Sequence, residues 1–146
     1  MAALRGWRRR LVYVAVYETL AILFATVALA WASERSLGHA GVVSVMASAI
    51  AVAWNYLYTW GFEAWEARQS VRGRSLRRRV GHALGFELGL VILLVPVLAW
   101  WLEVSLWQAL VLDLGLVLFF LCYTFVFNWA FDLAFGLPES ARDRVA

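Results

Sequence analysis

Acidic residues inside long apolar stretches are the feature of this sequence with the clearest chemical meaning. Glu18, Glu63, Glu87 and Asp132 interrupt such stretches at related positions, and Asp113 is a fifth acid of the same kind. A charge in the hydrocarbon core of a membrane costs several kcal/mol, so these residues usually face a bundle interior or a cavity. A carboxylate there can hold either a proton or an organic cation. Competition between the two would itself be an exchange mechanism.

The composition indicates which elements position these acids. Of the 146 residues, 64% are hydrophobic and 16% are charged, whereas soluble domains are about half apolar and a quarter charged. Those values exclude an ordinary soluble enzyme and a disordered chain. Four apolar runs each exceed the ~20 residues that cross a membrane as a helix, roughly Leu11–Ser33, Gly41–Trp65, Val80–Leu102 and Leu106–Phe135. We predict an all-α integral membrane protein with four transmembrane helices.

The arginines predict how the helices are oriented. Twelve of the thirteen lie at positions 5–10, at positions 68–79 and at positions 142 and 144, next to apolar runs. Clusters of basic residues can indicate a nucleic-acid site. Because these clusters flank apolar runs, cytoplasmic loops are the simpler interpretation. We therefore expect both termini on the cytoplasmic side of the membrane. The first run also resembles a secretory signal peptide, but its pattern recurs in the middle of the chain, where no signal peptide can lie.

The sequence repeats itself at an offset of 69 residues. Arg8–Arg10 align with Arg77–Arg79, Glu18 aligns with Glu87, and Glu63 aligns with Asp132, whereas Asp113 aligns with Ser44. Each repeat contains two spans, so both have the same orientation and are related by an axis along the membrane normal. We predict two helical hairpins, in residues 1–70 and 71–146, that enclose a face carrying matched polar residues.

Polar and aromatic residues on the spans suggest a path for a cation. Asn55, Thr59 and Glu63 form a stripe at helical spacing, as do Thr124, Asn128 and Asp132. Such stripes either hold helices together or line a hydrophilic path, and nearby aromatic rings either bind cations or simply pack. The predicted path residues are Tyr13, Tyr17, Trp54, Asn55, Tyr58, Thr59, His82, Phe86, Tyr123 and Asn128. The predicted cytoplasmic mouth consists of Arg10, Glu63, Arg79 and Asp132.

Glu18 and Glu87 are the predicted proton-coupling and substrate-binding acids. The alternative for Glu18 is a structural hydrogen bond or an ion pair with a snorkelling Arg10. No phosphate-binding loop, dinucleotide fingerprint or catalytic constellation is present in the sequence, so we expect no cofactor, no metal and no enzymatic activity.

Four sequence motifs resemble those of a known family. Residues 79–87 match RxxHAxxFE throughout. Residues 10–18 keep its Arg and Glu but have Tyr13 and Tyr17 in place of its His and Phe. Residues 54–63 follow WNxxYNxxFD except at Thr59 and Glu63, and residues 123–132 follow YxxxFNWxYD except at Phe131. In this respect the chain resembles the proteobacterial antimicrobial compound efflux transporters, which are built from two bacterial transmembrane pair domains.

The resemblance implies proton-coupled export of cationic compounds across the bacterial inner membrane. Substrates in that family include chlorhexidine, acriflavine, proflavine, quaternary ammonium biocides, and the short diamines putrescine and cadaverine. It also implies that Glu18 is the essential acid, linked to proton coupling and to a monomer–dimer equilibrium. Four helices make a thin wall around a pathway, so a homodimer is also expected. The departures at Tyr13, Tyr17 and Thr59 keep this acid and bear on the substrate range.

Two hypotheses of different classes follow. In the first, the chain is a cation:proton antiporter in which Glu18 exchanges a proton for a substrate and Glu87 is its counterpart. In the second, it is a non-transporting membrane assembly or sensor protein whose intramembrane carboxylates hold helices together. Small multidrug resistance carriers also have four spans and a first-span glutamate, but their subunits lack this tandem repeat.

Overall fold

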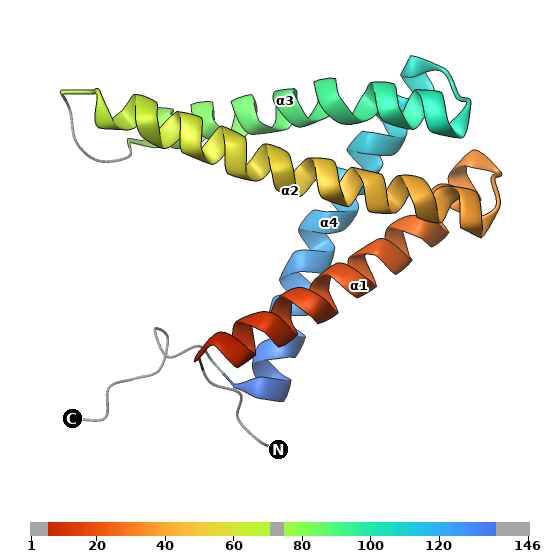
Figure 1. Cartoon of the computed structure of the whole chain (residues 1–146), viewed down its shortest axis with the longest axis horizontal. Helices are drawn as coiled ribbons and strands as arrows, with labels where there is room; N and C mark the ends of the chain where they lie inside the picture. The colour runs from red at the N-terminus through yellow and green to blue at the C-terminus, as the bar shows by residue number, and fades with distance from the viewer. Residues whose placement is uncertain (1–5, 71–74, 137–146) are drawn as a thin grey trace.

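The protein folds as four long helices. The computed structural model describes residues 6–70 and 75–136, and the regular elements in these ranges are α1 (Gly6–Ser33), α2 (Leu37–Ala67), α3 (Leu76–Leu102) and α4 (Leu106–Phe135) (Figure 1). Each helix is long and apolar enough to cross a membrane, which confirms the predicted fold class. Arginines 142 and 144 lie outside the described residues.

The first three helices begin four or five residues before the apolar runs that predicted them. Hydropathy marks the part of a helix that suits hydrocarbon, whereas backbone hydrogen bonding continues into its polar end. The starts of α2 and α3 are set by capping serines: the side chains of Ser36 and Ser75 accept hydrogen bonds from the amides of His39 and Arg78. The basic first turn of α3 is therefore helical.

The two short turns between paired helices have the same conformation. Glu34 and Glu103, which are 69 residues apart, have left-handed φ angles of 55° and 53°. In each turn the next amide bonds to an alanine carbonyl five residues earlier, at 3.2 and 3.1 Å. Ser36 and Ser105, again 69 residues apart, cap the helices that follow. The tandem repeat seen in the sequence is thus a repeat of local structure.

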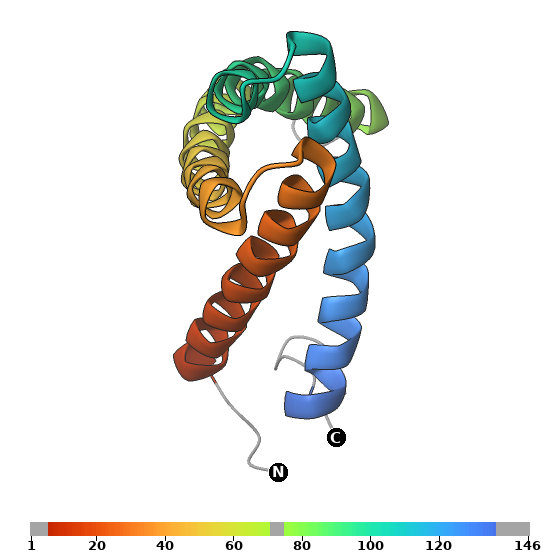
Figure 2. The ribbon, with the colours of Figure 1, turned by 90° about the vertical axis from the view of Figure 1, so that its right-hand side faces the viewer.

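The helices are arranged in a ring that is tightly packed at one end only. Neighbours in the ring are α1 and α2, α2 and α3, α3 and α4, and less extensively α4 and α1 (Figure 2). The core lies near the two short turns and consists of Leu29, Ala30, Ala40, Val43, Val95, Leu98, Leu102 and Ala109. Away from this packed end, the α2–α3 pair and the α1–α4 pair diverge (Figure 1).

Close packing between α2 and α3 depends on a glycine. A Cβ atom placed on Gly89 would overlap the indole ring of Trp54. The equivalent position of α1 carries Leu20. Because Gly removes a side chain at the contact, the indole ring of Trp54 can pack directly against α3.

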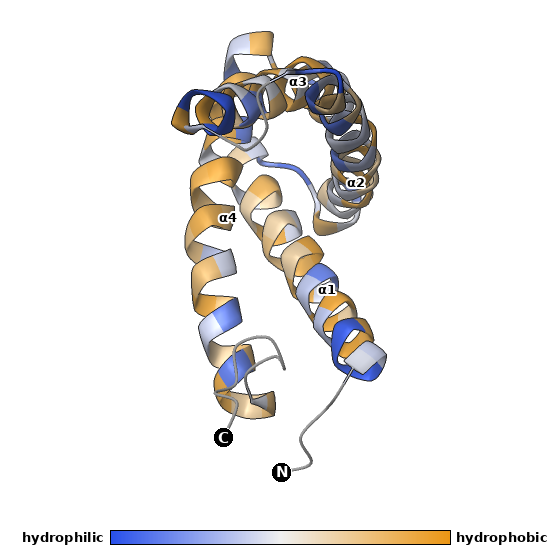
Figure 3. Cartoon of the chain, turned by 90° about the vertical axis from the view of Figure 1, so that its left-hand side faces the viewer, coloured by the Kyte–Doolittle hydropathy of each residue, from blue (hydrophilic) through white to orange (hydrophobic). Residues whose placement is uncertain are grey.

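The outer surface suits a lipid environment. Large apolar side chains such as Leu57, Leu88 and Leu118 are 63–67% exposed on the helices. Hydrophilic residues concentrate instead in the turns and at the helix ends that lie away from the packed end (Figure 3). An apolar exterior of this extent is expected of a chain that crosses a bilayer by four helices.

Candidate functional site

A cavity of about 950 Å³ lies between the diverging helices. All four helices contribute to its wall, which is mostly apolar. Its polar members are Tyr17, Glu18, Ser44, Ser48, Asn55, Tyr56, Glu87, Asp113, Thr124 and Asn128. A concave, mainly apolar site with a few polar groups is typical of small-molecule binding, and this volume is at the upper end of the usual range.

Glu18 and Glu87 both lie on the wall of this cavity, half-buried. The hydroxyl of Ser48 donates a hydrogen bond to Glu18 Oε2 at 2.8 Å. The repeat equivalent of Ser48 is Val117, which also lines the cavity, so the second repeat has no hydroxyl at the corresponding place. In the described part of the chain, Glu18 forms no ion pair with Arg10. The bond from Ser48 is a hydrogen bond of the kind that the structural alternative for Glu18 expects, so that alternative stays open.

Asp113 is a third carboxyl group on the wall, and sequence reasoning did not include it in the site. Its residue is only 2% exposed, and Oδ2 has no hydrogen-bond partner among residues 6–70 and 75–136. The repeat equivalent, Ser44, is also buried but donates to the carbonyl of Ala40 at 2.9 Å. One signal in the sequence could have identified Asp113. Among the acids within the apolar runs, it alone has a neutral residue, Ser44, at the equivalent position of the other repeat.

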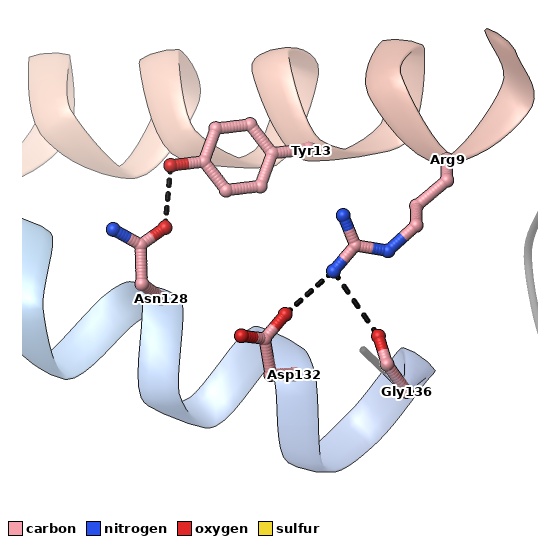
Figure 4. Close-up of polar contacts among 5 residues, drawn as sticks. All are labelled: Arg9, Tyr13, Asn128, Asp132 and Gly136. Atoms are coloured by element: carbon pink, nitrogen blue, oxygen red, sulfur yellow. Dashed lines mark hydrogen bonds and ion pairs between the residues drawn. The ribbon is translucent and has the colours of Figure 1, made fainter. Parts of the chain in front are cut away.

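The polar stripe predicted on the last helix pairs with a stripe of the same spacing on α1. The three pairs are Arg9–Asp132 at 2.5 Å, Tyr13–Asn128 at 2.6 Å and Tyr17–Thr124 at 2.8 Å. Figure 4 shows the first two, together with the bond from Arg9 to the Gly136 carbonyl at 3.1 Å. Tyr17, Thr124 and Asn128 also line the cavity. This stripe therefore joins helices and lines the cavity at once.

Aromatic side chains join the repeats at matched positions. Trp54 Nε1 donates to the Phe86 carbonyl at 3.0 Å, and the hydroxyl of Tyr123 donates to the Tyr17 carbonyl at 2.9 Å. The two bonds are related by the 69-residue offset, one at the α2–α3 contact and one at the α4–α1 contact. The repeat is therefore expressed in the contacts between hairpins as well as in their turns.

The structure divides the predicted path residues into two groups. Those on the cavity wall are Tyr17, Asn55, Phe86 and Asn128. Those off the wall are Tyr13, Trp54, Tyr58, Thr59, His82 and Tyr123. Tyr58, for example, donates to the His82 carbonyl at 3.0 Å and so joins α2 to α3. For both groups, a part in a substrate path stays a prediction.

The predicted mouth residues lie at the end of the bundle away from the short turns. Asp132 pairs there with Arg9, a residue that sequence reasoning did not single out, rather than with Arg10. Arg10, Glu63 and Arg79 are exposed. Hydropathy and charge predicted a basic end with acids near it, but the partner of each acid depends on which face of α1 turns toward α4.

The opposite end of the bundle is closed by contacts between the hairpins. Arg35 pairs with Glu103 at 2.6 Å and donates through Nε to the Leu102 carbonyl at 3.1 Å. His39 and Trp101 stack and exchange ring-to-backbone hydrogen bonds at 2.5 and 2.8 Å. These contacts lie beside the packed core, so the cavity ends there.

Comparison with known proteins agrees with this architecture. The chain matches a family described as a chlorhexidine efflux transporter (BTP) twice, over residues 5–68 and 74–137. A short-chain diamines transporter of Acinetobacter baylyi is 34% identical over 125 residues, which cover 86% of this chain and 88% of the relative. One of Vibrio parahaemolyticus is 35% identical over 123 residues, covering 84% and 87%. No solved structure matches.

These findings establish the family. The two matched segments contain one hairpin each and together cover most of the chain. A relative from Acinetobacter baumannii with the same name is 33% identical over 86% of each chain. The resemblance seen in the four motifs is thereby confirmed, and four apolar helices agree with a multi-pass bacterial membrane protein. The chain belongs to the chlorhexidine efflux transporter family, a family of transporters made of two tandem repeats.

Proposed function

We propose that this protein exports short diamines and related organic cations across the bacterial inner membrane in exchange for protons. The observation that carries the proposal is the charge of the cavity: Glu18, Glu87 and Asp113 line it, and no basic residue of the described chain does. Its remaining wall is mainly apolar, which suits the hydrocarbon part of an amine. The names of three relatives point to diamines.

Glu18 would carry the exchange. Its carboxyl group binds a proton in one step and a substrate ammonium in another, so loading one releases the other. Ser48 holds Oε2 by a hydrogen bond, which orients the carboxylate on the wall. Inward movement of one proton across 100 mV supplies about 2.3 kcal/mol. Glu87 is the equivalent group of the second repeat.

The arginine-bearing end would face the cytoplasm. Arg8, Arg9, Arg10 and Arg77 lie at helix starts on that end, whereas the opposite end has Arg35 alone among the described residues. Basic residues are retained on the cytoplasmic side. The core and the Arg35–Glu103 contact close the other end, so with this orientation the cavity would be shut toward the outside. Export would require those contacts to separate.

Chlorhexidine, acriflavine, proflavine and quaternary ammonium compounds are further candidate substrates, since the cavity has room for molecules larger than a diamine. A homodimer is also part of the proposal, and its mass in mild detergent would reveal it. The competing hypothesis of a non-transporting assembly or sensor protein has less support, because the family is one of transporters.

The test uses purified protein in liposomes with an imposed proton gradient and an internal pH dye. Putrescine, cadaverine and chlorhexidine are added in turn. We expect substrate-triggered proton movement with wild type, none with Glu18→Gln, and wild-type behaviour with Glu34→Gln, which removes an exposed acid from a short turn. If Glu18→Gln exchanges protons as well as wild type does, the mechanism is wrong.

Thermal unfolding in detergent separates transport from the assembly hypothesis. If Glu18 serves only to hold helices, Glu18→Gln lowers the melting temperature markedly and cationic substrates do not raise that of the wild type. If it is a binding site, a diamine well above its Kd stabilises the wild type by linkage. In that case the mutant loses this stabilisation while its own melting temperature stays near that of the wild type.

A further inference from the structure

Asp113 is the most deeply buried acid of the described chain, and neither the repeat nor the family motifs account for it. Asp113 is 2% exposed and lines the cavity. Its Oδ2 atom has no hydrogen-bond partner in residues 6–70 and 75–136. A buried polar atom without a partner is costly and calls for an explanation such as an absent ion or ligand. Its position on the wall makes a cavity ligand the natural partner.

Asp113 and Glu18 occupy different parts of the same cavity. Glu18 is held at the level of Ser48 on α2. Asp113 is the repeat equivalent of Ser44, which precedes Ser48 by one helical turn, so Asp113 lies about 6 Å nearer the packed end. Asp113 projects from α4, whereas the carboxylate of Glu18 reaches from α1 to Ser48 on α2, and α2 is not a neighbour of α4 in the ring. The two carboxyl groups therefore differ in depth and lie toward different helices.

Glu87 adds negative charge near Asp113. The two carboxyl groups are close enough to interact electrostatically, and both line the cavity. No basic side chain of the described residues lines the wall that could offset them. A cation bound at Asp113 would relieve this repulsion and give the buried oxygen its missing donor. An ammonium group has three such donors.

We propose that Asp113 binds the second ammonium group of a short diamine while Glu18 binds the first. The inference rests on the proposed function and makes Asp113 the residue that distinguishes diamines from monoamines. An extended carbon chain advances about 1.25 Å per bond, so a diamine of four or five carbons spaces its nitrogens about 6–8 Å apart. With a hydrogen bond of about 2.8 Å at each end, such a molecule bridges carboxylates up to about 12 Å apart.

The test compares binding of diamines and monoamines of equal length to the purified full chain in detergent. Cadaverine and pentylamine are titrated calorimetrically against wild type, Asp113→Asn and the control Glu34→Gln. We expect Asp113→Asn to weaken cadaverine binding about 10–100-fold, the worth of a charge-assisted hydrogen bond, and to change pentylamine binding by less than about threefold. Glu34→Gln should bind both amines as wild type does.

A second variant controls for the possibility that Asp113→Asn loses binding because it misfolds. Asp113→Ser reproduces what the first repeat carries at Ser44, so the fold already accepts this residue at the equivalent position. Asp113→Ser should lose the diamine preference just as Asp113→Asn does. If the variants and the wild type prefer cadaverine over pentylamine to the same degree, the role of Asp113 is overturned. The same holds if the variants lose affinity for both amines equally. Either result leaves the proposed function intact. A wild type that binds neither amine would overturn both.

Discussion

Two ion pairs of similar length but different burial allow a quantitative test of how α1 is held to α4. Arg9 and Asp132 lie 2.5 Å apart with side chains 15% and 35% exposed, whereas Arg35 and Glu103 lie 2.6 Å apart and are 36% and 69% exposed. Arg9 also donates to the Gly136 carbonyl. The perturbation is the pair of substitutions Arg9→Gln and Asp132→Asn, made singly and together.

The magnitude follows from the partial burial. Two unit charges about 4 Å apart attract by about 4 kcal/mol at an effective dielectric constant of 20. Desolvation and side-chain ordering offset much of this attraction, and fully exposed pairs retain only about 0–1 kcal/mol. Breaking a fully buried pair costs about 3–5 kcal/mol. For a pair as buried as Arg9–Asp132 we expect a coupling free energy of about 1–3 kcal/mol.

The assay is a double-mutant cycle on the free energy of unfolding, measured by titrating detergent-solubilised protein with sodium dodecyl sulfate. A second cycle with Arg35→Gln and Glu103→Gln is the matched control, with an expected coupling of about 0–1 kcal/mol. Added salt should weaken the control coupling more, because exposed charges are screened more strongly. A coupling at the control pair equal to or larger than that at Arg9–Asp132 would refute the argument from burial.

Two further predictions each compare a test substitution with a control substitution of the same residue type. Gly89→Ala should destabilise the protein by about 1–3 kcal/mol, because the new methyl group overlaps the indole ring that packs on α3. Gly115→Ala, with no neighbour within 4 Å, should be neutral or stabilising by up to about 1 kcal/mol in the same titration with sodium dodecyl sulfate. Ser48→Ala should weaken cadaverine binding about 3–10-fold by removing the donor to Glu18. Ser44→Ala should not, because that hydroxyl bonds within its own helix; the calorimetric comparison would contradict this if both variants behaved alike.

The fold could be predicted from the sequence because a membrane leaves few choices. A chain crossing hydrocarbon must satisfy its backbone internally, so four apolar runs of sufficient length predict four helices. The 69-residue offset then predicted two equivalent hairpins. The matched bonds of Trp54 to Phe86 and of Tyr123 to Tyr17 show that these hairpins also form equivalent contacts with each other.

The direction in which each side chain points was harder to predict. In a soluble helix the apolar face identifies the core, but in a membrane the lipid-facing side is as apolar as the interior. Sequence reasoning therefore could not tell that Trp54 and Tyr58 reach the neighbouring helix while Asn55, between them, lines the cavity. Those directions depend on close approach at sites such as Gly89, which composition does not reveal.

The departures of this chain from the family motifs gain a physical meaning from the structure. Tyr13 and Tyr17 stand where the matching motif has His and Phe. Their hydroxyl groups bond to Asn128 and Thr124, so both substitutions supply contacts between α1 and α4. Phe lacks a hydroxyl and cannot make the second of these bonds. The departures therefore add polar contacts at the edge of the cavity rather than removing its acids.

The differences between the two repeats matter more for function than their likeness. If the repeats were identical, Glu18 and Glu87 would have the same surroundings, and a substrate could bind in two equivalent orientations. Instead, Glu18 has the hydroxyl of Ser48 where Glu87 has Val117, and only the second repeat adds Asp113. One half of the cavity therefore carries an oriented single carboxylate and the other carries two interacting ones. Two such halves cannot bind an ammonium group equally, so a diamine in this cavity meets chemically different partners at its two ends.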